Sequence, residues 1–252
     1  MDLICSDLHA NLYAMRVLRK YIKAHKPERL FILGDIVGYG AHPNEVVQMV
    51  KTFMDEIPTY VIHGNHDYAV MNPEFMQEFN HRAMQAAVWT MNTLTPENIQ
   101  FIDSLKPDMV LDDIECVHGS PTGFNDYILT RWDSMAAFNA MKTHLCFFGH
   151  THLPCIISGE MDDLGMYVTD VSESYTSGKW IQLNASNKTL INPGSVGQPR
   201  DRNPKLSFCL FDPIVYAVKH VRLTYDWDAA KAAIDKVTDL HPSLGLRLLE
   251  GW

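Results

Sequence analysis

The sequence predicts an α/β fold, and three features of the chain support this prediction. Short apolar runs, such as residues 30–33 and 145–148, are bounded by glycine and turn residues, which is typical of buried strands. Segments with apolar residues three or four positions apart indicate amphipathic helices. Strand and helix patterns also alternate along the chain, as they do in α/β proteins.

The individual elements can be assigned in order along the chain. Strands are expected within residues 3–5, 30–33, 60–62, 114–117, 145–148 and 190–191. A first helix is predicted by apolar residues that share one face: Leu12, Met15, Leu18 and Ile22. A second helix begins at Pro43 and a third covers Asp133–Lys142. The inner face of the second helix is expected to carry Val46, Val50 and either Phe53 or Met54.

Residues 68–108 interrupt the alternation of strand and helix patterns. They are rich in Met, Gln, Asn and aromatic residues, and we predict helices there, one of which starts at Thr95-Pro96-Glu97. The segment is inserted between two strands that end in polar residues. It therefore either caps a site and shapes its pocket or packs as ordinary helices, and the sequence favours neither interpretation.

The second half of the chain has a different pattern. Residues 158–189 predict antiparallel strands around Met166-Tyr167-Val168 and Trp180–Leu183. Residues 206–211 and 214–223 predict a hairpin joined at Asp212-Pro213, and one amphipathic helix is expected beyond Asp228. Because no linker-like stretch divides the chain, we expect a single domain over residues 1–252, with 68–108 as a cap-like insertion and 228–252 as a C-terminal helical segment.

Charge and cysteine content narrow the class of protein. The net charge is -9 and no run of Lys or Arg occurs, which argues against a nucleic-acid or anionic-membrane binder. A phosphate-bearing substrate stays compatible with this balance, because bound metal ions would reverse the local field. Five cysteines without paired spacing indicate buried free thiols in a reducing compartment. The chain lacks a signal-like start and an apolar run of ~18 residues, so we expect a soluble, cytoplasmic protein.

Polar residues follow the apolar runs where each predicted strand ends. They are Asp7, His9, Asp35, Asn65, His66, His118, His150 and His152. In open α/β sheets, sites form beyond the carboxyl ends of the strands. Imidazoles with carboxylates suit Zn, Mn, Fe, Co or Ni better than Mg or Ca. The set is too large for one tetrahedral ion, but it suits two ions that share a carboxylate.

In this order, the motifs resemble those of the calcineurin-like metallophosphoesterase superfamily. The motifs are Asp7-Leu8-His9, Gly34-Asp35, Gly64-Asn65-His66-Asp67, His118-Gly119 and Gly149-His150-Thr151-His152. Residues 7–11, residues 34–40 and Asn192-Pro193-Gly194-Ser195 are similar to those of its compact prokaryotic branch, which includes small phosphodiesterases. The resemblance covers roughly residues 1–212. It implies a four-layer α/β/β/α sandwich with a metal site at the carboxyl ends of the strands.

The resemblance also implies a role for each motif residue. A first metal ion would be held by Asp7, His9, His152 and a bridging Asp35. A second would be held by Asn65, His118, His150 and the same Asp35. The ions would be two divalent transition metals: Mn, Fe, Zn, Ni or Co. His66 matches the family histidine that contacts the substrate phosphate and protonates the leaving group. Many relatives have Gly where this chain has Ala10, which changes a turn rather than a ligand.

Other residues near the motifs have two interpretations each. Asn11 either donates to a substrate phosphate or caps the first helix, and we favour the cap. Arg200 either binds a phosphate or lies in a surface loop. Asp67 either orients His66 or stabilises the turn, and we favour the turn. Three further histidines are expected to be structural or exposed: His42, His63 and His81. Four glycines are expected to let the backbone turn beside the ions: Gly34, Gly64, Gly119 and Gly149.

Two-metal hydrolysis of a phosphoester, which includes nucleotide-derived substrates, is the function that these motifs favour. Within that class a phosphodiesterase is preferred, and the alternatives are a phosphoprotein phosphatase or a dinucleoside polyphosphate hydrolase. Phosphoprotein phosphatases typically continue Gly-Asp with a second Asp and an Arg, whereas this chain has Ile36-Val37-Gly38. A non-catalytic protein-binding scaffold would have lost key site residues, and none is lost here. The excess of acidic over basic residues argues against a nuclease, which would need a basic surface to bind nucleic acid.

Overall fold

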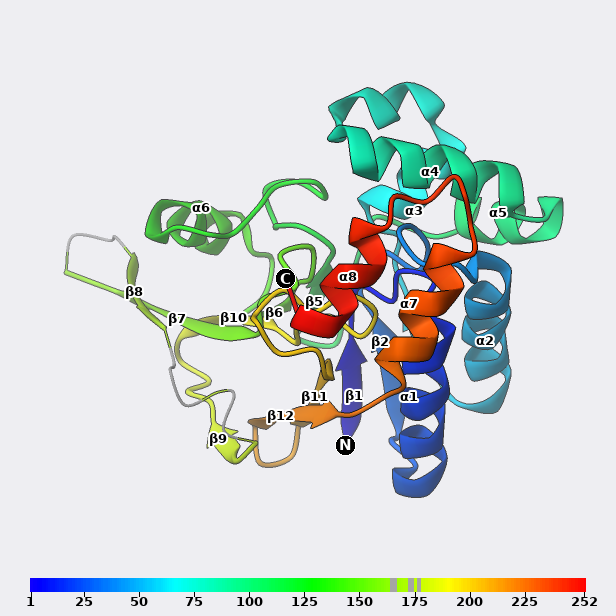
Figure 1. Ribbon diagram of the computed structural model, residues 1–252. Coiled ribbons are helices and arrows are strands. Elements are labelled where there is room, and N and C mark those ends of the chain that lie inside the picture. Colours follow the sequence, from blue (N-terminus) through cyan, green and yellow to red (C-terminus); the bar gives the residue numbers. More distant parts are fainter. Residues whose placement is uncertain (164–166, 172–174, 176–177) are drawn as a thin grey trace.

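Two β-sheets form the centre of the computed structural model, which describes residues 1–163, 167–171, 175 and 178–252 (Figure 1). Each sheet has six strands within this part of the chain. In spatial order, the first sheet contains β3 (Thr59–Val61), β2 (Arg29–Ile32), β1 (Asp2–Cys5), β11 (Leu206–Asp212), β12 (Ala217–Leu223) and β9 (Trp180–Gln182). The second contains β4 (Asp108–Leu111), β5 (Ile114–Val117), β6 (Leu145–Phe147), β10 (Lys188–Asn192), β7 (Cys155–Met161) and β8 (Tyr167–Val171).

Parallel pairing aligns the strand ends that carry the motifs. In the first sheet, β1 pairs with β2 and β2 with β3, all parallel, with Leu3 opposite Leu30 and Phe31 opposite Tyr60. In the second sheet, β5, β6 and β10 are parallel as well. When parallel strands are aligned in register, the loops that follow them lie at the same edge of the sheet. The motif residues after β1, β2 and β3, and those after β5 and β6, therefore lie at common sheet edges.

Alternating side chains on the strands create separate apolar layers. Leu3 and Leu30 point to one face of the first sheet and pack with the buried residues of the flanking helices. Ile4 and Phe31 point to the opposite face and pack against residues of the second sheet such as Phe147. The outer face of the second sheet packs on a further helix. This alternation follows from the two-residue period of a strand. The result is helix, sheet, sheet, helix, so the predicted four-layer sandwich is confirmed.

The first two helices agree with the sequence pattern. Helix α1 (Leu12–His25) is capped by Asn11, whose side chain accepts a hydrogen bond from the Ala14 N–H at 3.1 Å. Helix α2 (Pro43–Glu56) begins at Pro43, as predicted, because a proline at this position lacks only an N–H that would have no helical partner. Phe53 is buried and Met54 is exposed, so Phe53 belongs to the inner face.

The inserted segment is helical, as predicted. It contains the end of α3 (Asn65–Met71), the 3₁₀ helix η1 (Pro73–Glu78), α4 (His81–Thr93) and α5 (Pro96–Asp103). Thr95 caps α5 by accepting from the Asn98 N–H. Helix α6 (Arg131–Ala140) starts two residues earlier than the predicted Asp133. The physical reason is a capping box, in which Thr130 and Asp133 bond each other's backbone N–H, so Asp133 lies in the first turn.

Two predictions for the last third of the chain were wrong in detail. The strand predicted from Ile214 starts at Ala217, because Asp212 accepts hydrogen bonds from the N–H groups of Ile214 and Val215 and holds them in the turn. The single helix predicted beyond Asp228 is two helices, α7 (Trp227–Asp235) and α8 (Ser243–Glu250). Pro242 lies immediately before α8. The predicted strand residue Met166 lies outside the described residues.

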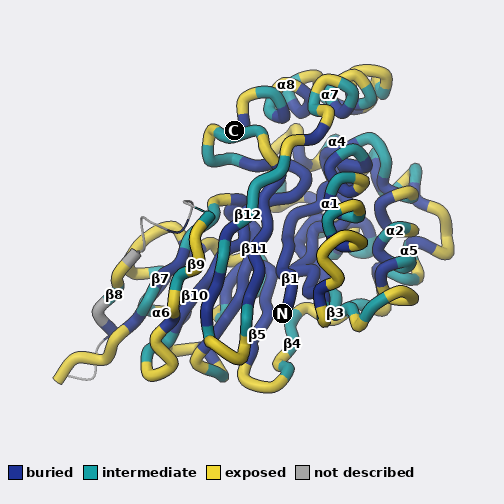
Figure 2. The backbone as a smooth tube through the Cα atoms, turned by 90° about the horizontal axis from the view of Figure 1, so that it is seen from below, coloured by how far each residue is buried: buried dark blue, intermediate teal, exposed yellow. Residues whose placement is uncertain are grey.

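The strands of the two sheets are more buried than the turns and the outer helices (Figure 2). Figure 2 shows the strands of both sheets mostly buried, while turns and the outer sides of α7 and α8 are exposed. All five cysteines are free, and four of them are buried, as predicted from their spacing. Among the residues that the structure describes, no helix combines the length and apolar character needed to cross a bilayer.

Candidate metal centre

The loops after β1 and β2 are tied together and held in an unusual backbone conformation. The His9 N–H donates to Asp35 O at 2.9 Å, and the Asp7 N–H donates to Gly34 O at 3.1 Å. Asp7, His9 and Asp35 have φ values of 56°, 45° and 50°, in the left-handed region. Such values cost energy for residues with a Cβ, and they gather where structure is held for function. His150 and His152, after β6, share this conformation.

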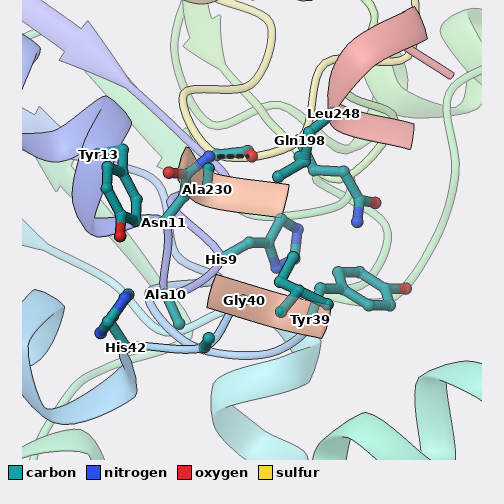
Figure 3. A pocket seen from close by; sticks show the side chains of 13 residues that line it. His9, Ala10, Asn11, Tyr13, Tyr39, Gly40, His42, Gln198, Ala230 and Leu248 are labelled. Atoms are coloured by element: carbon teal, nitrogen blue, oxygen red, sulfur yellow. Dashed lines mark hydrogen bonds between the residues drawn. The ribbon is translucent and has the colours of Figure 1, made fainter. Parts of the chain in front are cut away.

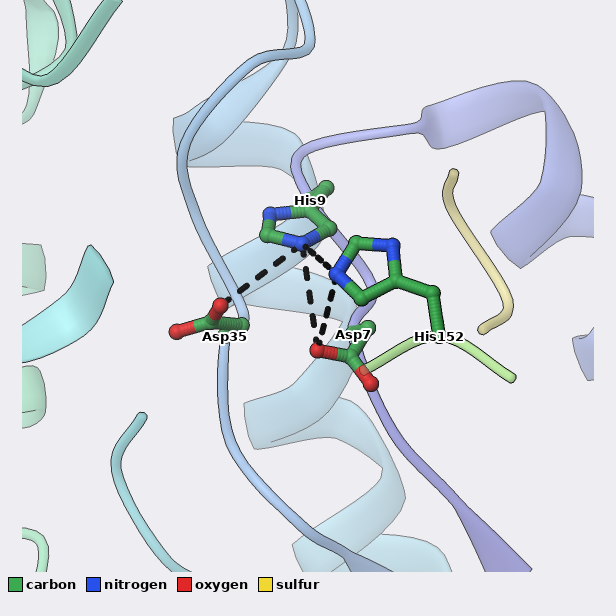
Figure 4. Close-up of side chains that lie close together, drawn as sticks. All are labelled: Asp7, His9, Asp35 and His152. Carbon is green, nitrogen blue, oxygen red and sulfur yellow. Dashed lines mark hydrogen bonds and ion pairs between the residues drawn. The ribbon is translucent and has the colours of Figure 1, made fainter. Parts of the chain in front are cut away.

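Four side chains form a fully buried first cluster: Asp7, His9, Asp35 and His152 (Figure 4). His9 Nε2 lies 3.0 Å from His152 Nε2, and His152 Nε2 lies 3.2 Å from Asp7 Oδ1. His9 Nε2 is 3.6 Å from Asp35 Oδ2. The Nδ1 atom of each histidine faces a backbone carbonyl, Val37 O or Gln198 O. Each ring proton therefore lies on Nδ1, which leaves the two Nε2 lone pairs facing each other.

Asp35 is also part of a second cluster. Asp35, His118 and His150 bring ligand atoms within 4.8 Å of one another. His118 Nε2 lies 3.3 Å from Asp35 Oδ2 and 3.1 Å from Asn65 Oδ1. His118 Nδ1 donates to Leu33 O at 2.7 Å, so its Nε2 too is oriented toward the carboxylate. The structure thus brings together all seven residues predicted as metal ligands, with Asp35 in the shared position.

These residues fit divalent cations on two further grounds. Asp7 Oδ2 and His150 Nε2 are buried and have no hydrogen-bond partner, which is costly for a polar atom unless a cation binds it. Although burial opposes charge on Asp35, the neighbouring His118 and His66 hold its pKa well below the ordinary value. Burial and His118 lower the pKa of His150 to about 3. Anionic carboxylates and neutral imidazoles are the forms that bind metals.

His118 behaves differently from His150. Burial disfavours its charged form, but Asp35 and Asp7 raise its pKa to about 9. Without a metal ion, a proton on His118 Nε2 would partly neutralise Asp35. A metal ion at the same position would replace that proton, because binding to imidazole requires the unprotonated nitrogen.

His66 lies beside the clusters without joining either of them. Its backbone N–H donates to Asp35 Oδ1 at 2.8 Å, and its ring centre is 5.2 Å from that of His9. Tyr39 and Phe79 pack on the same ring at 4.3 and 4.7 Å. A Cβ on Gly38 would come within 2.6 Å of His66 Nδ1, so only glycine leaves room for the ring there. Burial lowers the pKa of His66 to about 4, although Asp35 opposes this shift.

A cavity of about 120 Å³ opens over the clusters. His66, Asn65 and His150 form part of its wall, and Arg200 is a further wall residue. Seven lining residues were not identified from the sequence: Tyr39, Glu78, Phe79, Asn80, Ala83, Asn125 and Tyr127. Tyr39 lies within the motif at 34–40, whereas residues 119–130 have no periodicity that would have indicated Tyr127. The ring of Tyr127 packs on His150, with centres 4.0 Å apart.

The remaining predicted residues have structural contacts. Asn11 caps α1 and donates through Nδ2 to Gly197 O, so both ends of its amide have protein partners, and it does not line the cavity. Asp67 accepts from the N–H groups of Gly64, Ile36 and Val37, which supports the turn interpretation. His63 is buried outside both clusters, His42 is half-buried, and His81 is exposed.

Two of the predicted turn glycines are needed for different reasons, one for its backbone conformation and the other for lack of space. Gly34 has a φ of 89°, a conformation that favours glycine. Gly64 is extended, but a Cβ there would come within 2.2 Å of Asp35 Oδ1. Ala10 has a φ of 50°, a conformation that favours glycine.

Comparison with known proteins agrees with this arrangement. Residues 3–154 match the model of the calcineurin-like phosphoesterase family. An uncharacterised protein of Methanocaldococcus jannaschii is 35% identical over 265 residues, covering 100% of this chain and 98% of that protein. A metallophosphoesterase structure from Sphaerobacter thermophilus is 34% identical with a TM-score of 0.82, covering 100% of this chain and 98% of that one. A hypothetical protein of Pyrococcus horikoshii has the same fold, with 20% identity, a TM-score of 0.79, and coverage of 100% and 99%.

The fold and the paired Asp/His clusters define a metallophosphoesterase-type hydrolase. The chain belongs to the calcineurin-like phosphoesterase family. Family membership and the buried clusters together support metal-dependent phosphoesterase activity, with a phosphoester as the class of substrate. The clusters are consistent with a dinuclear metal site.

Proposed function

We propose that this protein is a two-metal phosphodiesterase. One ion would be held by Asp7, His9, His152 and Asp35, and the other by Asn65, His118, His150 and Asp35. The observation that carries the proposal is the pair of unprotonated Nε2 atoms of His9 and His152, 3.0 Å apart and beside two carboxylates. Two facing lone pairs repel each other, and a cation between them converts this repulsion into coordination. Mixed imidazole and carboxylate donors favour Mn, Fe, Zn, Ni or Co.

The reaction would depend on both the ions and the surrounding side chains. When bound, two such ions supply an activated water nucleophile and neutralise charge on the phosphoryl oxygens. Asp35, at 1% exposure, would fix the separation of the two ions because its carboxylate belongs to both clusters. The carbonyls of Val37, Leu33 and Gln198 would keep the ligand imidazoles in the required orientation.

His66 would act as the proton donor to the leaving group. Its Nδ1 is buried beside Gly38, so we assign proton transfer to Nε2. Its lowered pKa describes the protein without substrate. A bound anionic phosphoester would raise that pKa, because a nearby negative charge favours the imidazolium form. Donation by a positioned histidine contributes about 10²–10⁴-fold to a rate.

The helical insertion at 68–108 would form one wall of the substrate pocket. Phe79, Asn80 and Ala83 belong to this insertion and line the cavity. Asn125 and Tyr127 line it from the segment that follows β5. The cap interpretation is supported by these contacts, since ordinary packing helices would not reach the cavity beside the ligands.

Hydrolysis of bis-p-nitrophenyl phosphate and of p-nitrophenyl phosphate tests the proposal. The chelator-stripped protein would be reloaded separately with Mn, Ni, Co, Zn and Mg. We expect turnover that requires a transition metal and favours the diester. Preference for the monoester would replace the phosphodiesterase with a phosphatase. Absence of turnover on both substrates, with two ions bound, would contradict the proposed activity.

A further inference from the structure

Arg200 lines the cavity, and Arg82 and Arg247, from separate parts of the chain, lie near enough for the charges of Arg82 and Arg200 to act on Arg247. Arg82 is in the first turn of α4, Arg200 follows β10, and Arg247 is in the last turn of α8. Among the described residues, no carboxylate lies within ion-pair distance of any of the three, a property that they share with Arg16, Arg131 and Arg202, whereas Arg19, Arg29 and Arg222 are paired.

Arg200 is held in place at the wall of the cavity. Its Nη2 donates to Gln198 Oε1 at 3.0 Å, and its guanidinium carbon is 5.7 Å from the ring centre of Tyr39. Its Nε is buried and has no partner. Arg200 lines the same cavity as His66 and His152, which places it close to the reacting region. Arg200 therefore presents an ordered cation to the cavity.

Arg247 is brought close to Arg200 by the end of the chain. Gly251 O, at the end of α8, accepts from the Arg202 N–H at 2.6 Å, which ties α8 to the loop containing Arg200. The neighbour of Arg247, Leu248, lines a small cavity together with Gln198 and Tyr39 (Figure 3). Arg247 itself is half-buried. Arg200 and Tyr39 are both near enough to influence the charge of Arg247 electrostatically.

Arg82 approaches from the helical insertion. Asn80 Oδ1 accepts from the N–H groups of Arg82 and Ala83 at 3.1 Å each, and both Asn80 and Ala83 line the cavity. The N-terminus of α4 therefore lies at the cavity with Arg82 in its first turn. A helix N-terminus carries a partial positive charge, which adds to the charge of the arginine. Arg82 is exposed, so it can reach an anion at the cavity mouth.

The three guanidinium groups repel one another in the absence of an anion. Burial lowers the pKa of Arg247, and the charges of Arg200 and Arg82 lower it further. Glu78, an exposed residue that also lines the cavity, cannot by itself neutralise three cations. Grouped guanidinium ions lower stability unless an anion lies between them, and their planar donors suit phosphate oxygens.

We propose that Arg82, Arg200 and Arg247 form a subsite for a second phosphate group of the substrate. The proposal rests on the proposed function, because the first phosphate would occupy the metal centre. It narrows the substrate class to phosphodiesters that carry at least one further phosphate group. A simple diester with one phosphate would use only part of the site.

Nucleotide binding to the Mn-loaded protein tests the subsite. Isothermal titration calorimetry at fixed free Mn²⁺ would compare adenosine 5′-monophosphate with adenosine 5′-diphosphate and adenosine 3′,5′-bisphosphate. A charge-assisted contact to phosphate corresponds to about tenfold or more in affinity. We expect at least one of the two doubly phosphorylated nucleotides to bind about tenfold tighter than the monophosphate. Equal affinities for all three nucleotides would overturn the subsite.

Substitutions distinguish two sources of tighter nucleotide binding: contacts between the second phosphate and the arginines, and chelation of the metal ion by that phosphate. R82Q and R247Q should each remove most of the gain from the second phosphate and leave monophosphate affinity unchanged. R16Q removes an exposed arginine from α1 and should change neither affinity. Equal melting temperatures would show that the variants fold. If the gain persists in both R82Q and R247Q, the subsite is wrong.

The two proposals can fail separately. Lack of bis-p-nitrophenyl phosphate hydrolysis would contradict the proposed activity, while the calorimetric comparison would still decide on the subsite. Hydrolysis of that diester with no gain from a second phosphate would retain the activity and reject the subsite.

Discussion

Two groups of buried histidines in this protein differ in where the ring proton lies. At the candidate metal centre, His9 and His152 direct Nδ1 at backbone carbonyl oxygens, so Nε2 is left unprotonated. On β12, His220 has its Nε2 2.6 Å from Ser207 Oγ, and that hydroxyl donates its own proton to a backbone carbonyl. The ring proton of His220 therefore lies on Nε2 and is used in a hydrogen bond.

This difference shows that burial does not identify a metal ligand. His9 and His220 are both 1% exposed. The two residues differ in the partner of the ring nitrogen that carries the proton. They also differ in their surroundings, because the free lone pair of His9 points to the same place as that of His152. Changes at the metal centre should therefore alter metal content and turnover, and changes at His220 should alter stability alone. Four substitutions can break or sharpen this contrast.

Asp35→Asn should have the largest effect. The amide keeps the size of the side chain but removes the negative charge shared by both clusters. We expect most of the bound metal to be lost and turnover to fall by about 10⁴-fold or more, since activation of water and neutralisation of phosphoryl charge both depend on the ions. Elemental analysis and diester hydrolysis would measure this. Retention of two ions per chain would refute the shared position of Asp35.

His66→Ala should lower turnover by about 10³-fold, within the usual range for removing a proton donor, and leave both ions bound. His66 contacts Asp35 through its backbone N–H, which the substitution preserves. His42→Ala is a suitable control, because His42 is half-buried and lines no part of the cavity over the ligands. Unchanged turnover in the His66 variant would remove this residue from the mechanism.

His220→Gln should change how stability depends on pH. Burial, with a contribution from Arg222, lowers the pKa of His220 to about 3 from an ordinary value of 6.5. Between these values the unfolded chain binds a proton that the folded chain does not, so stability is lost as pH falls below 6.5. From pH 7 to pH 5 this contribution is about 2 kcal/mol.

The measurement is urea unfolding of the metal-loaded protein at pH 5 and pH 7. The glutamine can still donate to Ser207 Oγ but does not titrate, so the variant should lose about 2 kcal/mol less than the natural chain over this range. Metal content and turnover should stay unchanged at pH 7. An identical pH dependence in the two proteins would contradict the lowered pKa of His220.

Asn11→Ala should have the smallest effect. Asn11 lies two residues from His9, but its amide caps α1 and donates to Gly197 O. Removing the cap should lower the free energy of unfolding by about 1 kcal/mol and leave the KM for the diester unchanged. A raised KM with unchanged stability would instead support the phosphate-binding role considered from the sequence.

Much of the fold could be predicted because the signals were local. The apolar stripe of α1, Pro43 at the start of α2 and Thr95 before α5 all correspond to observed features. The errors occurred where short polar contacts overrode the pattern, as at Asp133 in its capping box and at Asp212 in the hairpin turn. Strand order was beyond the reach of local signals, since β9 pairs with β12 while β10 lies in the other sheet.

The candidate site was predictable in part. The residues predicted as metal ligands follow strands, so each had a recognisable position in the sequence. Arg82 and Arg247 had no such signal, because each is one charged residue on the polar side of an amphipathic helix. Tyr127 also had no signal in the sequence, because it lies in a segment without regular secondary structure. Their proximity to Arg200 depends on how α4, α8 and the loop after β10 pack together.

By itself, the sequence determined the α/β class, the ligand types and their place after the strands, because these depend on hydrophobic period and on neighbours along the chain. Only the tertiary structure decided which imidazole nitrogen is free, which histidine is structural, and which arginines converge. Those properties depend on partners far apart in sequence, such as His152 with Gln198 O and α8 with the loop at Arg202. Hydrogen bonds and charges act through space, and packing decides which of them meet.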